Sequence, residues 1–340
     1  RNYNEINMSV DKAKQLDANI KDLMHYYEIF LKDGKCRAVK SRKLLKDSAK
    51  LINAIEEEVW DNLVRLGHYD EARELRPDRE IIGLHFQSLM TRTKDINITQ
   101  FCDGSAYLDH MSRIRSARGA TMPDSFKVDP LMYQGASDKF LLWNEDIHPF
   151  PYEYGIDFEA EVGVIVGNVP LGVSVEDADG YIKYVTIIND ISLRKLIPGE
   201  LAKGFGFFQS KPHSSLGKCS ISPSKWPRYT SSWKDSRLHG TMIIELNDKQ
   251  IGKIDTAAGM TFSFAELISY AAKTRGLSNN TLIGSGTVAS SDISDGFGCL
   301  MERNAVLDEP EIYMKPGDKI TMYIEGLKDE LIISQKVADI

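Results

Sequence analysis

The sequence predicts an α+β protein with a helical N-terminal region and a β-rich remainder. In the first hundred positions, apolar residues recur every three or four residues, which is helical spacing. From about residue 100 onward, short β-branched runs alternate with glycine and proline, and one clear helix interrupts them. We therefore expect a mostly helical region over 1–99 and a second domain over 100–340, in line with the two domains that 340 residues allow.

The N-terminal region is predicted to form helices over 11–32 and roughly 42–66, with a shorter one at 69–76 that Pro77 stops. The first helix presents one apolar face, made by Leu16, Ile20, Leu23, Tyr27 and Phe30. No group of catalytic residue types gathers here, so a packing or dimerisation module is the preferred interpretation.

The β-rich region is predicted to contain strands at 157–167, 182–189, 240–247 and 318–324. The segment IELNDKQIG, 244–252, favours a hairpin with Asn247 and Asp248 near its turn. The segment FSFAELISYAAKT predicts a helix over 262–274.

Composition excludes several classes of function. The net charge is −7 and basic patches with interleaved aromatics are absent, so a nucleic-acid partner is not expected. No apolar run is long enough for a membrane helix, and no secretory signal or phosphate-binding glycine motif is visible. The sequence begins at Arg1 rather than Met, so a targeting segment stays an open alternative. The four cysteines are far apart, which disfavours a zinc site or disulfides and fits a cytoplasmic, reducing location.

The stretch DFEAEVGVIVG, 157–167, places three acids on one face of a predicted strand. Side chains alternate along a strand, so Asp157, Glu159 and Glu161 share a face. Two carboxylates at i and i+2 can reach one hard cation, which prefers oxygen ligands. A solvated acidic face remains the alternative.

Four further stretches carry residue types suited to chemistry. Asp190 ends an apolar strand, and Arg194 follows four residues later. Asp103 precedes His110, which is a candidate general base. Lys203 adjoins a glycine-rich turn, and Glu302 follows the segment 284–301, which is rich in serine and glycine. For each, an ordinary structural role stays open: a turn aspartate, a packed histidine, a plain turn and a surface loop.

Together these stretches, from about 100 to 340, resemble the fumarylacetoacetate hydrolase family, especially its bacterial members. The family's acid strand, Asn-Asp-x-Ser-x-Arg segment, lysine-glycine loop and Ser-Gly-Thr turn look like DFEAEVGVI, NDISLR, KGFG and SGT here. The seven-residue spacing from Asp103 to His110, and Tyr133 within DPLMYQG, are also similar.

The resemblance implies a role for each matching residue. One divalent cation, Mg²⁺ or Ca²⁺ with Mn²⁺ as an alternative, would be bound by Asp103, Glu159, Glu161 and Asp190. Asp157 has no matching ligand role, so it is expected to be solvated or paired with a basic side chain. The catalytic residues would be His110 as general base, Glu302 as its orienting partner, and Arg194 and Lys203 as stabilisers of negative charge. Substrate would contact Tyr133, Arg118, Gly206 and Thr287, with Arg118 matching only after a small shift in spacing.

The substrate pocket departs from the family pattern. Ile197 stands where the animal enzymes have a glutamine of the oxyanion site, Phe207 replaces a substrate-contacting threonine, and Ser105 replaces a substrate tyrosine. The metal and base positions match, whereas the substrate contacts differ, so the exact substrate does not follow from the resemblance.

The implied protein is a homodimeric hydrolase with a mixed β-roll or β-sandwich core. Its implied reaction cleaves a C–C bond in a β-diketo acid, such as fumarylacetoacetate or an acylpyruvate, as in tyrosine and aromatic-compound catabolism. The alternatives are an oxo-acid decarboxylase or dehydratase on the same scaffold, and a non-catalytic, metal-stabilised binding protein. Relatives of the decarboxylase kind often lack the set Asp103, His110 and Glu302, so its presence favours hydrolysis.

Overall fold

The computed structural model describes residues 90–339, except positions 118, 120 and 224–232. The helices predicted at 11–32, 42–66 and 69–76 lie outside these residues and stay predictions. The described unit begins with strand β1, Met90–Arg92, ten residues before the predicted boundary at position 100.

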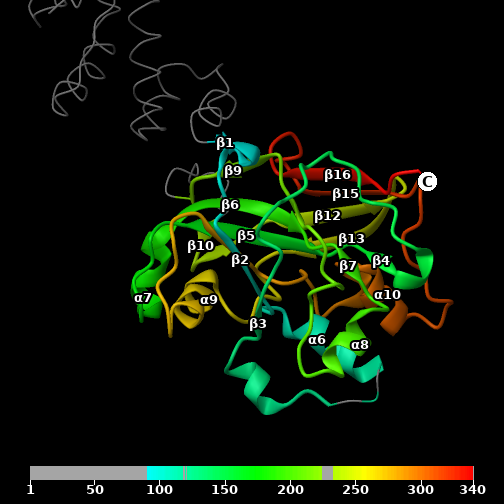
Figure 1. Ribbon diagram of the computed structural model, residues 1–340, viewed down its shortest axis with the longest axis horizontal. Coiled ribbons are helices and arrows are strands. Elements are labelled where there is room, and N and C mark those ends of the chain that lie inside the picture. Colours follow the sequence, from blue (N-terminus) through cyan, green and yellow to red (C-terminus); the bar gives the residue numbers. More distant parts are fainter. Residues whose placement is uncertain (1–89, 118, 120, 224–232, 340) are drawn as a thin grey trace, which may run out of the picture. The chain divides into compact units, whose positions relative to one another are not determined.

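An eight-stranded mixed sheet forms the centre of the unit (Figure 1). Its order is β1-β9-β6-β5-β14-β2-β3, and the short strand β8 also pairs with β6. Only the pair β14–β2 is parallel among these ladders; the others are antiparallel. Beyond β1, the strands are β2 Gln100–Gly104, β3 Met132–Gln134, β5 Ala160–Val166, β6 Ile182–Asn189, β8 Ser215–Leu216, β9 Cys219–Ile221 and β14 Thr281–Gly284.

The central strands are apolar because both of their faces are covered. Every residue of β5 is buried, as are the last five residues of β6. Such continuous burial explains why β5 reads as an apolar run rather than as a polar and apolar alternation. A carboxylate on this strand, such as that of Glu161, must therefore find its compensation inside the protein.

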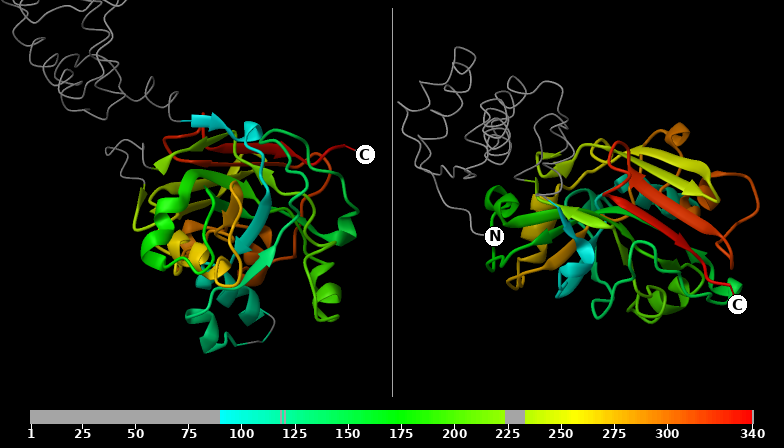
Figure 2. Two further views of the ribbon diagram at one scale, coloured as in Figure 1. Left: turned by 60° about the vertical axis from the view of Figure 1, so that its left-hand side comes forward. Right: turned by 90° about the horizontal axis from the view of Figure 1, so that it is seen from above.

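A second, four-stranded antiparallel sheet has the order β13-β12-β15-β16. Strands β12 Thr241–Leu246 and β13 Lys249–Asp255 form the predicted hairpin, and Asn247 and Asp248 at its turn have φ values of 53° and 60°. These left-handed values suit a two-residue hairpin turn, so the sequence prediction is confirmed. Strand β16, Ile332–Lys336, contacts β6 and so joins the two sheets, with β15 Lys319–Ile324 beside it (Figures 1 and 2).

Two short strand pairs complete the β structure. Strand β4, Ile156–Asp157, pairs with β7, Ser192–Leu193, and β10, Trp233–Lys234, pairs with β11, Arg237–Leu238. The acidic strand predicted to run from residue 157 is thus divided: β4 ends at Asp157 and β5 begins at Ala160.

Short helices flank the sheets. The α-helices are α6 Leu108–Ala117, α7 Val175–Ala178, α8 Ile197–Leu201, α9 Phe264–Ala271 and α10 Leu300–Val306. Helix α6 packs against α10, and α7 packs against α9. The 3₁₀ turns are Thr93–Asp95, Asp124–Lys127, Tyr152–Tyr154, Asp179–Tyr181 and Ile293–Asp295. The α6–α10 contact is the one that matters for the site, since both helices carry expected site residues.

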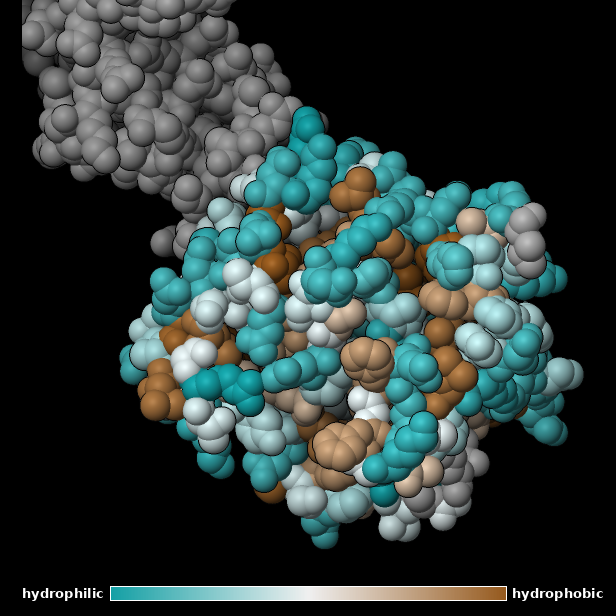
Figure 3. All heavy atoms as spheres, in the orientation of Figure 1, coloured by the Kyte–Doolittle hydropathy of each residue, from teal (hydrophilic) through white to brown (hydrophobic). Residues whose placement is uncertain are grey.

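The predicted helix at 262–274 is present as α9, and a capping box fixes its start. The Ser263 side chain accepts from the amide of Glu266, whose carboxylate accepts in turn from Ser263. In the described residues, a mixed sheet with few helices agrees with the predicted α+β class, whereas the β-roll or β-sandwich core stays a prediction. On the face shown in Figure 3, hydrophilic residues predominate and hydrophobic ones emerge in separate patches. None of the helices in the described part of the chain has the length and apolarity that a membrane crossing requires.

Candidate active site

Three buried carboxylates from distant segments meet at the end of the central strands. Asp103 lies on β2, Glu161 on β5 and Asp190 directly after β6, and ligand oxygens from the three lie within 4.8 Å of one another. Gly284 on β14 lies between β2 and β5, paired with Asp103 on one side. A Cβ atom at position 284 would lie 2.2 Å from Oδ1 of Asp103 and 3.0 Å from Oε2 of Glu161, so the cluster requires glycine there.

Burial and mutual repulsion disfavour the charged forms of this cluster. Burial raises the pKa of Asp103 well above its usual range, and the nearby carboxylates of Asp190 and Glu159 raise it further. The pKa of Glu161 is raised in the same way, by burial and then by Asp103 and Asp190. A cation bound among these carboxylates would offset the repulsion and favour their charged forms.

Glu161 gives the clearest sign that the cluster suits a cation. It is fully buried, and among the described residues no nitrogen or hydroxyl group donates to either of its carboxylate oxygens. Buried carboxylates without donors are rare, because each unmade bond leaves the desolvation cost uncompensated. Oxygen ligands at this spacing fit a hard divalent cation, and Asp103, Glu161 and Asp190 would hold it.

Glu159, the fourth expected ligand, is held beside the cluster by two cations. Nζ of Lys211 lies 2.5 Å from Oε2 of Glu159 and 2.5 Å from Oδ2 of Asp190. Nη2 of Arg194 lies 2.7 Å from Oε1 of Glu159. Burial alone would raise the pKa of Glu159, but Arg194, Lys211 and, more weakly, His110 outweigh it and hold the pKa below its usual range.

Three hydrogen-bond donors hold the carboxylate of Asp190 in place. Its carboxylate accepts from the Tyr133 hydroxyl at 2.5 Å, from the Ser214 hydroxyl at 2.5 Å and from Lys211. Burial and the carboxylates of Asp190 and Asp103 raise the pKa of the Tyr133 phenol well above its usual range, so it stays a hydrogen-bond donor. The position of Asp190 is therefore fixed before any ligand arrives.

A histidine–carboxylate pair lies on the contact between α6 and α10. Nδ1 of His110 lies 3.1 Å from Oε1 of Glu302, and both side chains are buried. The Nδ1 contact favours the tautomer with its proton on Nδ1, which leaves Nε2 free to accept a proton. Nη1 of Arg113 lies 3.6 Å from the same Glu302 oxygen as an ion pair.

Cys299 completes the immediate surroundings of this pair. Its sulfur lies within 4.8 Å of ligand atoms of His110 and Glu302. Burial raises the pKa of the Cys299 thiol well above its usual range, and Asp157 raises it further. A neutral thiol is a poor nucleophile and a poor metal ligand, so Cys299 acts here as packing.

Sequence comparison now identifies the family. The family model described as "Fumarylacetoacetate (FAA) hydrolase C-terminal" matches residues 99–330. The chain belongs to the fumarylacetoacetate hydrolase family. The match covers every motif on which the resemblance was based, and it contains the acid cluster, Lys211 and the His110–Glu302 pair.

Two relatives show the range of activities within the family. The chain is 26% identical over 229 residues to the oxaloacetate tautomerase YisK of Bacillus subtilis, covering 66% of each protein. It is 25% identical over 177 residues to the caffeoylpyruvate hydrolase of Neonothopanus nambi, covering 51% of this chain and 46% of that protein. The chain thus spans at most about two thirds of these relatives.

Solved structures share the fold at low sequence identity. The fumarylpyruvate hydrolase of Pseudomonas aeruginosa, solved with Mn²⁺ and pyruvate, matches with a TM-score of 0.51 at 14% identity, covering 71% of this chain and 90% of that one. A putative HpcE protein of Mycobacterium smegmatis matches with a TM-score of 0.53 at 20% identity, covering 71% and 75%. These likenesses support the family's fold for residues 90–339.

The expected substrate residues are placed less uniformly than the acids. Tyr133 contacts the cluster through Asp190, and the hydroxyl of Thr287 is buried without a hydrogen-bond partner. Gly206 lies in an exposed turn after α8, and Arg118 lies outside the described residues. Phe207 packs its ring 4.9 Å from that of Tyr133, so the residue that departs from the family's threonine still lies next to the site.

Lys203 is not part of the buried site in this structure. It is exposed in the turn after α8, whereas the ammonium group among the carboxylates belongs to Lys211. The choice of Lys203 came from its neighbouring glycines, which mark a turn rather than a charge partner. Lys211 has no local pattern of its own; only a search for a buried cation to match four acids could have found it.

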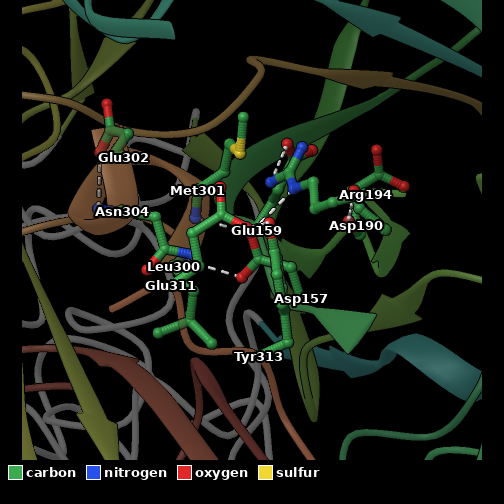
Figure 4. Close-up of polar contacts among 12 residues, drawn as sticks. Asp157, Glu159, Asp190, Arg194, Leu300, Met301, Glu302, Asn304, Glu311 and Tyr313 are labelled. Carbon is green, nitrogen blue, oxygen red and sulfur yellow. Dashed lines mark hydrogen bonds and ion pairs between the residues drawn. The ribbon is translucent and has the colours of Figure 1, made fainter. Parts of the chain in front are cut away.

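Asp157 is paired with a basic side chain, which is one of its two expected states. It is fully buried and accepts from Nε of Arg194 at 2.8 Å (Figure 4). Burial raises the pKa of the Asp157 carboxyl, and Arg194 with two backbone amides partly offsets the rise. The pairing with a basic side chain is confirmed, and the solvated alternative is wrong.

Proposed function

We propose that this protein is a divalent-metal-dependent hydrolase that cleaves the C–C bond of a β-diketo acid, with acylpyruvates as the substrate class. The observation that carries the proposal is a pair of buried groupings, the His110–Glu302 pair and the three clustered carboxylates, which are close enough for His110 to act electrostatically on Glu159. A general base next to a cation site is what hydrolysis of a chelating dicarbonyl needs. Caffeoylpyruvate hydrolase among the relatives supports the choice of acylpyruvates.

The residues that would hold the cation are Asp103, Glu161 and Asp190, with Glu159 alongside. When bound, a divalent ion supplies a Lewis acid that polarises the carbonyl under attack and stabilises negative charge on the dicarbonyl oxygens. The orphaned oxygens of Glu161 and the raised pKa values of Glu161 and Asp103 support this assignment.

The side chains of the protein would perform the remaining steps. Nε2 of His110 accepts a proton from water, whose oxygen attacks the acyl carbonyl carbon, while Glu302 stabilises the imidazolium that forms. The C–C bond to the methylene carbon then breaks, and the protonated His110 returns a proton to that carbon. An acylpyruvate plus water thus gives one carboxylic acid and pyruvate.

Two buried cations would offset the negative charge that develops. Nη2 of Arg194 is buried and lies 2.7 Å from Oε1 of Glu159 as an ion pair. Its positive charge would also stabilise a negative substrate oxygen beside the cluster. Lys211 provides a second positive charge between Glu159 and Asp190. The loss of one such donor typically costs about 10²–10³ in rate.

The test is a panel of acylpyruvates, including fumarylpyruvate and acetylpyruvate, each assayed with Mn²⁺, Mg²⁺ and Ca²⁺ after removal of bound metal. We expect metal-dependent formation of pyruvate and the matching acid in equal amounts, identified by mass. The His110→Gln variant serves as the control for contaminating activity. Full turnover in excess chelator, or no acid pair from any substrate although Mn²⁺ binds, would overturn the proposal.

A tautomerase of oxo acids is the second candidate, because the oxaloacetate tautomerase matches over 229 residues. There His110 would carry a proton between carbon and oxygen without cleaving a bond. Faster decay of the enol absorbance of oxaloacetate, with no acid pair from any acylpyruvate, would favour this activity over hydrolysis.

A further inference from the structure

Asp157 connects three separate segments through one carboxylate. Oδ1 accepts from the amide of Leu300 at 2.8 Å, and Oδ2 accepts from the amide of Met301 at 2.9 Å and from Nε of Arg194 at 2.8 Å (Figure 4). The side chain is fully buried, so water does not share these contacts. Strand β4 thus holds both the start of α10 and a guanidinium of the candidate active site.

The first turn of α10 depends on this distant acceptor. A helix begins with amides that have no partner within the helix, and a residue at its start usually supplies one. Cys299 stands at that position and its side chain makes no such bond. Asp157 replaces it from 143 residues away, as a negative charge at the positive end of the helix.

The residue after Met301 is the base-orienting Glu302. Oε1 of Glu302 faces Nδ1 of His110, and Oε2 accepts from the amide of Gly298 at 3.0 Å. A shift of the first turn of α10 would therefore move Glu302 directly and His110 through it. The amide that Asp157 holds at position 301 is one residue from the pair.

Arg194 is the second group that Asp157 holds, beside the start of α10. Its Nε is bound to Asp157, which leaves Nη2 next to Glu159. Without Asp157 the guanidinium would keep only the contact with Glu159, and it could turn toward that carboxylate. The guanidinium would then lose its fixed position beside the carboxylate cluster even though Arg194 itself remains.

We propose that Asp157 is a positioning residue that holds the His110–Glu302 pair, through α10, and the Arg194 guanidinium in one fixed arrangement. The inference rests on the proposed function for its effect on turnover, but its structural part, the orientation of the His110 ring, is independent of the substrate.

The test compares Asp157→Asn with wild type. The amide keeps the shape of the side chain but presents a donor toward Arg194 or α10. We expect kcat to fall about 10²-fold, the scale of a small misplacement of catalytic groups, while KM and the Mn²⁺ dissociation constant change less than threefold. We also expect the ¹⁵N signal of His110 Nδ1, identified by its loss in His110→Gln, to shift as its bond to Glu302 weakens.

Ser263→Ala is the matched control. It removes a helix cap of α9 instead of α10, and we expect it to lower Tm by about 2–4 °C while leaving kcat and the His110 signal unchanged. This control separates a positioning role from a general loss of stability. Wild-type kcat in Asp157→Asn, or an unchanged His110 signal, would overturn the inference.

Leu300→Pro gives a second route if Asp157→Asn does not fold. Proline suits the first helical position and the extended backbone of the preceding Cys299, with φ −155° and ψ 167°. It deletes the amide that donates to Oδ1 of Asp157, and Leu300→Ala controls for the loss of the buried leucine side chain. Relative to that control we expect a smaller fall in kcat, about tenfold, and a His110 shift in the same direction. An unchanged His110 Nδ1 signal would contradict the proposal that Asp157 acts on the His110–Glu302 pair through α10. If wild type proves inactive on every acylpyruvate, the NMR comparison still decides the inference while the proposed function fails.

Discussion

The ammonium nitrogen of Lys211 lies 2.5 Å from Oδ2 of Asp190, inside the carboxylate cluster. The same nitrogen lies 2.5 Å from Oε2 of Glu159, so one lysine links two of the four expected ligands. Burial alone would lower the pKa of Lys211, but Asp190 and Glu159 outweigh it and raise the pKa above its usual range. The lysine is therefore a permanent positive charge in the site.

Replacement of Lys211 by methionine should affect stability and activity together. Removing one partner of a buried ion pair leaves the other charge uncompensated, which typically costs about 3–5 kcal/mol. We expect the Tm of Lys211→Met to be lower than that of wild type. Added Mn²⁺ should restore part of this lost stability, because the metal binds only the folded state. We also expect kcat to fall by about 10²–10³. Thermal unfolding with and without Mn²⁺, together with kinetics, measures these effects.

Lys203→Met is the matched control for that variant. Lys203 is exposed, and surface substitutions usually change stability by less than about 0.5 kcal/mol. We expect wild-type kcat and Tm. If Lys203→Met lost activity as strongly as Lys211→Met, the lysine expected from sequence would be the functional one after all.

The contrast between these lysines shows what sequence could supply. Glu159, Glu161 and Asp190 could be predicted from local patterns. The first two are spaced i and i+2 at the start of β5, and Asp190 directly follows β6. The basic partners of these acids could not be predicted, because Lys211 contacts Glu159 across 52 residues of sequence. Pairing of charges is decided by tertiary packing rather than by spacing.

The contacts of Asp157 also could not be predicted from the sequence pattern. Periodicity placed it on one face with Glu159 and Glu161, but the break between β4 and β5 gives it a different set of neighbours. Its partners, Leu300 and Met301, are more than 140 residues away. Strands β5, β6, β12, β13 and β15 and helix α9 could be predicted from the sequence, whereas α6, α10 and the capping of α10 required the structure.

Glu161→Gln should separate metal binding from folding. The glutamine has the same shape, and it removes a buried negative charge whose oxygens have no donor. We expect the metal-free protein to keep or raise its Tm, because repulsion with Asp103 and Asp190 is relieved, and to lose the Tm increase that Mn²⁺ gives wild type. Thermal unfolding over a Mn²⁺ titration measures this, with the exposed Glu153→Gln as control. A Mn²⁺ response equal to that of wild type would remove Glu161 from the ligand set.

His110→Gln should abolish turnover without affecting the metal. Loss of a general base typically costs about 10²–10⁴ in rate, whereas the clustered carboxylates stay in place. We expect kcat to fall within that range and the Mn²⁺ dissociation constant, measured by calorimetry, to stay within threefold. The exposed His148→Gln should match wild type in both. A loss of Mn²⁺ binding in His110→Gln would mean that the histidine acts on the metal site rather than on water.

Metal binding should release protons, and its affinity should rise with pH. Burial and neighbouring carboxylates raise the pKa values of Asp103 and Glu161 above the value of about 4 for exposed carboxyls. Because their folded-state values are raised, they stabilise the metal-free protein below about pH 4, and that contribution is lost as pH rises through the raised values. A divalent cation binds the ionised carboxylates, so it displaces their protons and offsets this loss. Calorimetry of Mn²⁺ binding in two buffers with different ionisation enthalpies counts the protons released, and Asp103→Asn should release fewer. Equal heats in the two buffers would show that the cluster is already fully ionised, contrary to the raised pKa values.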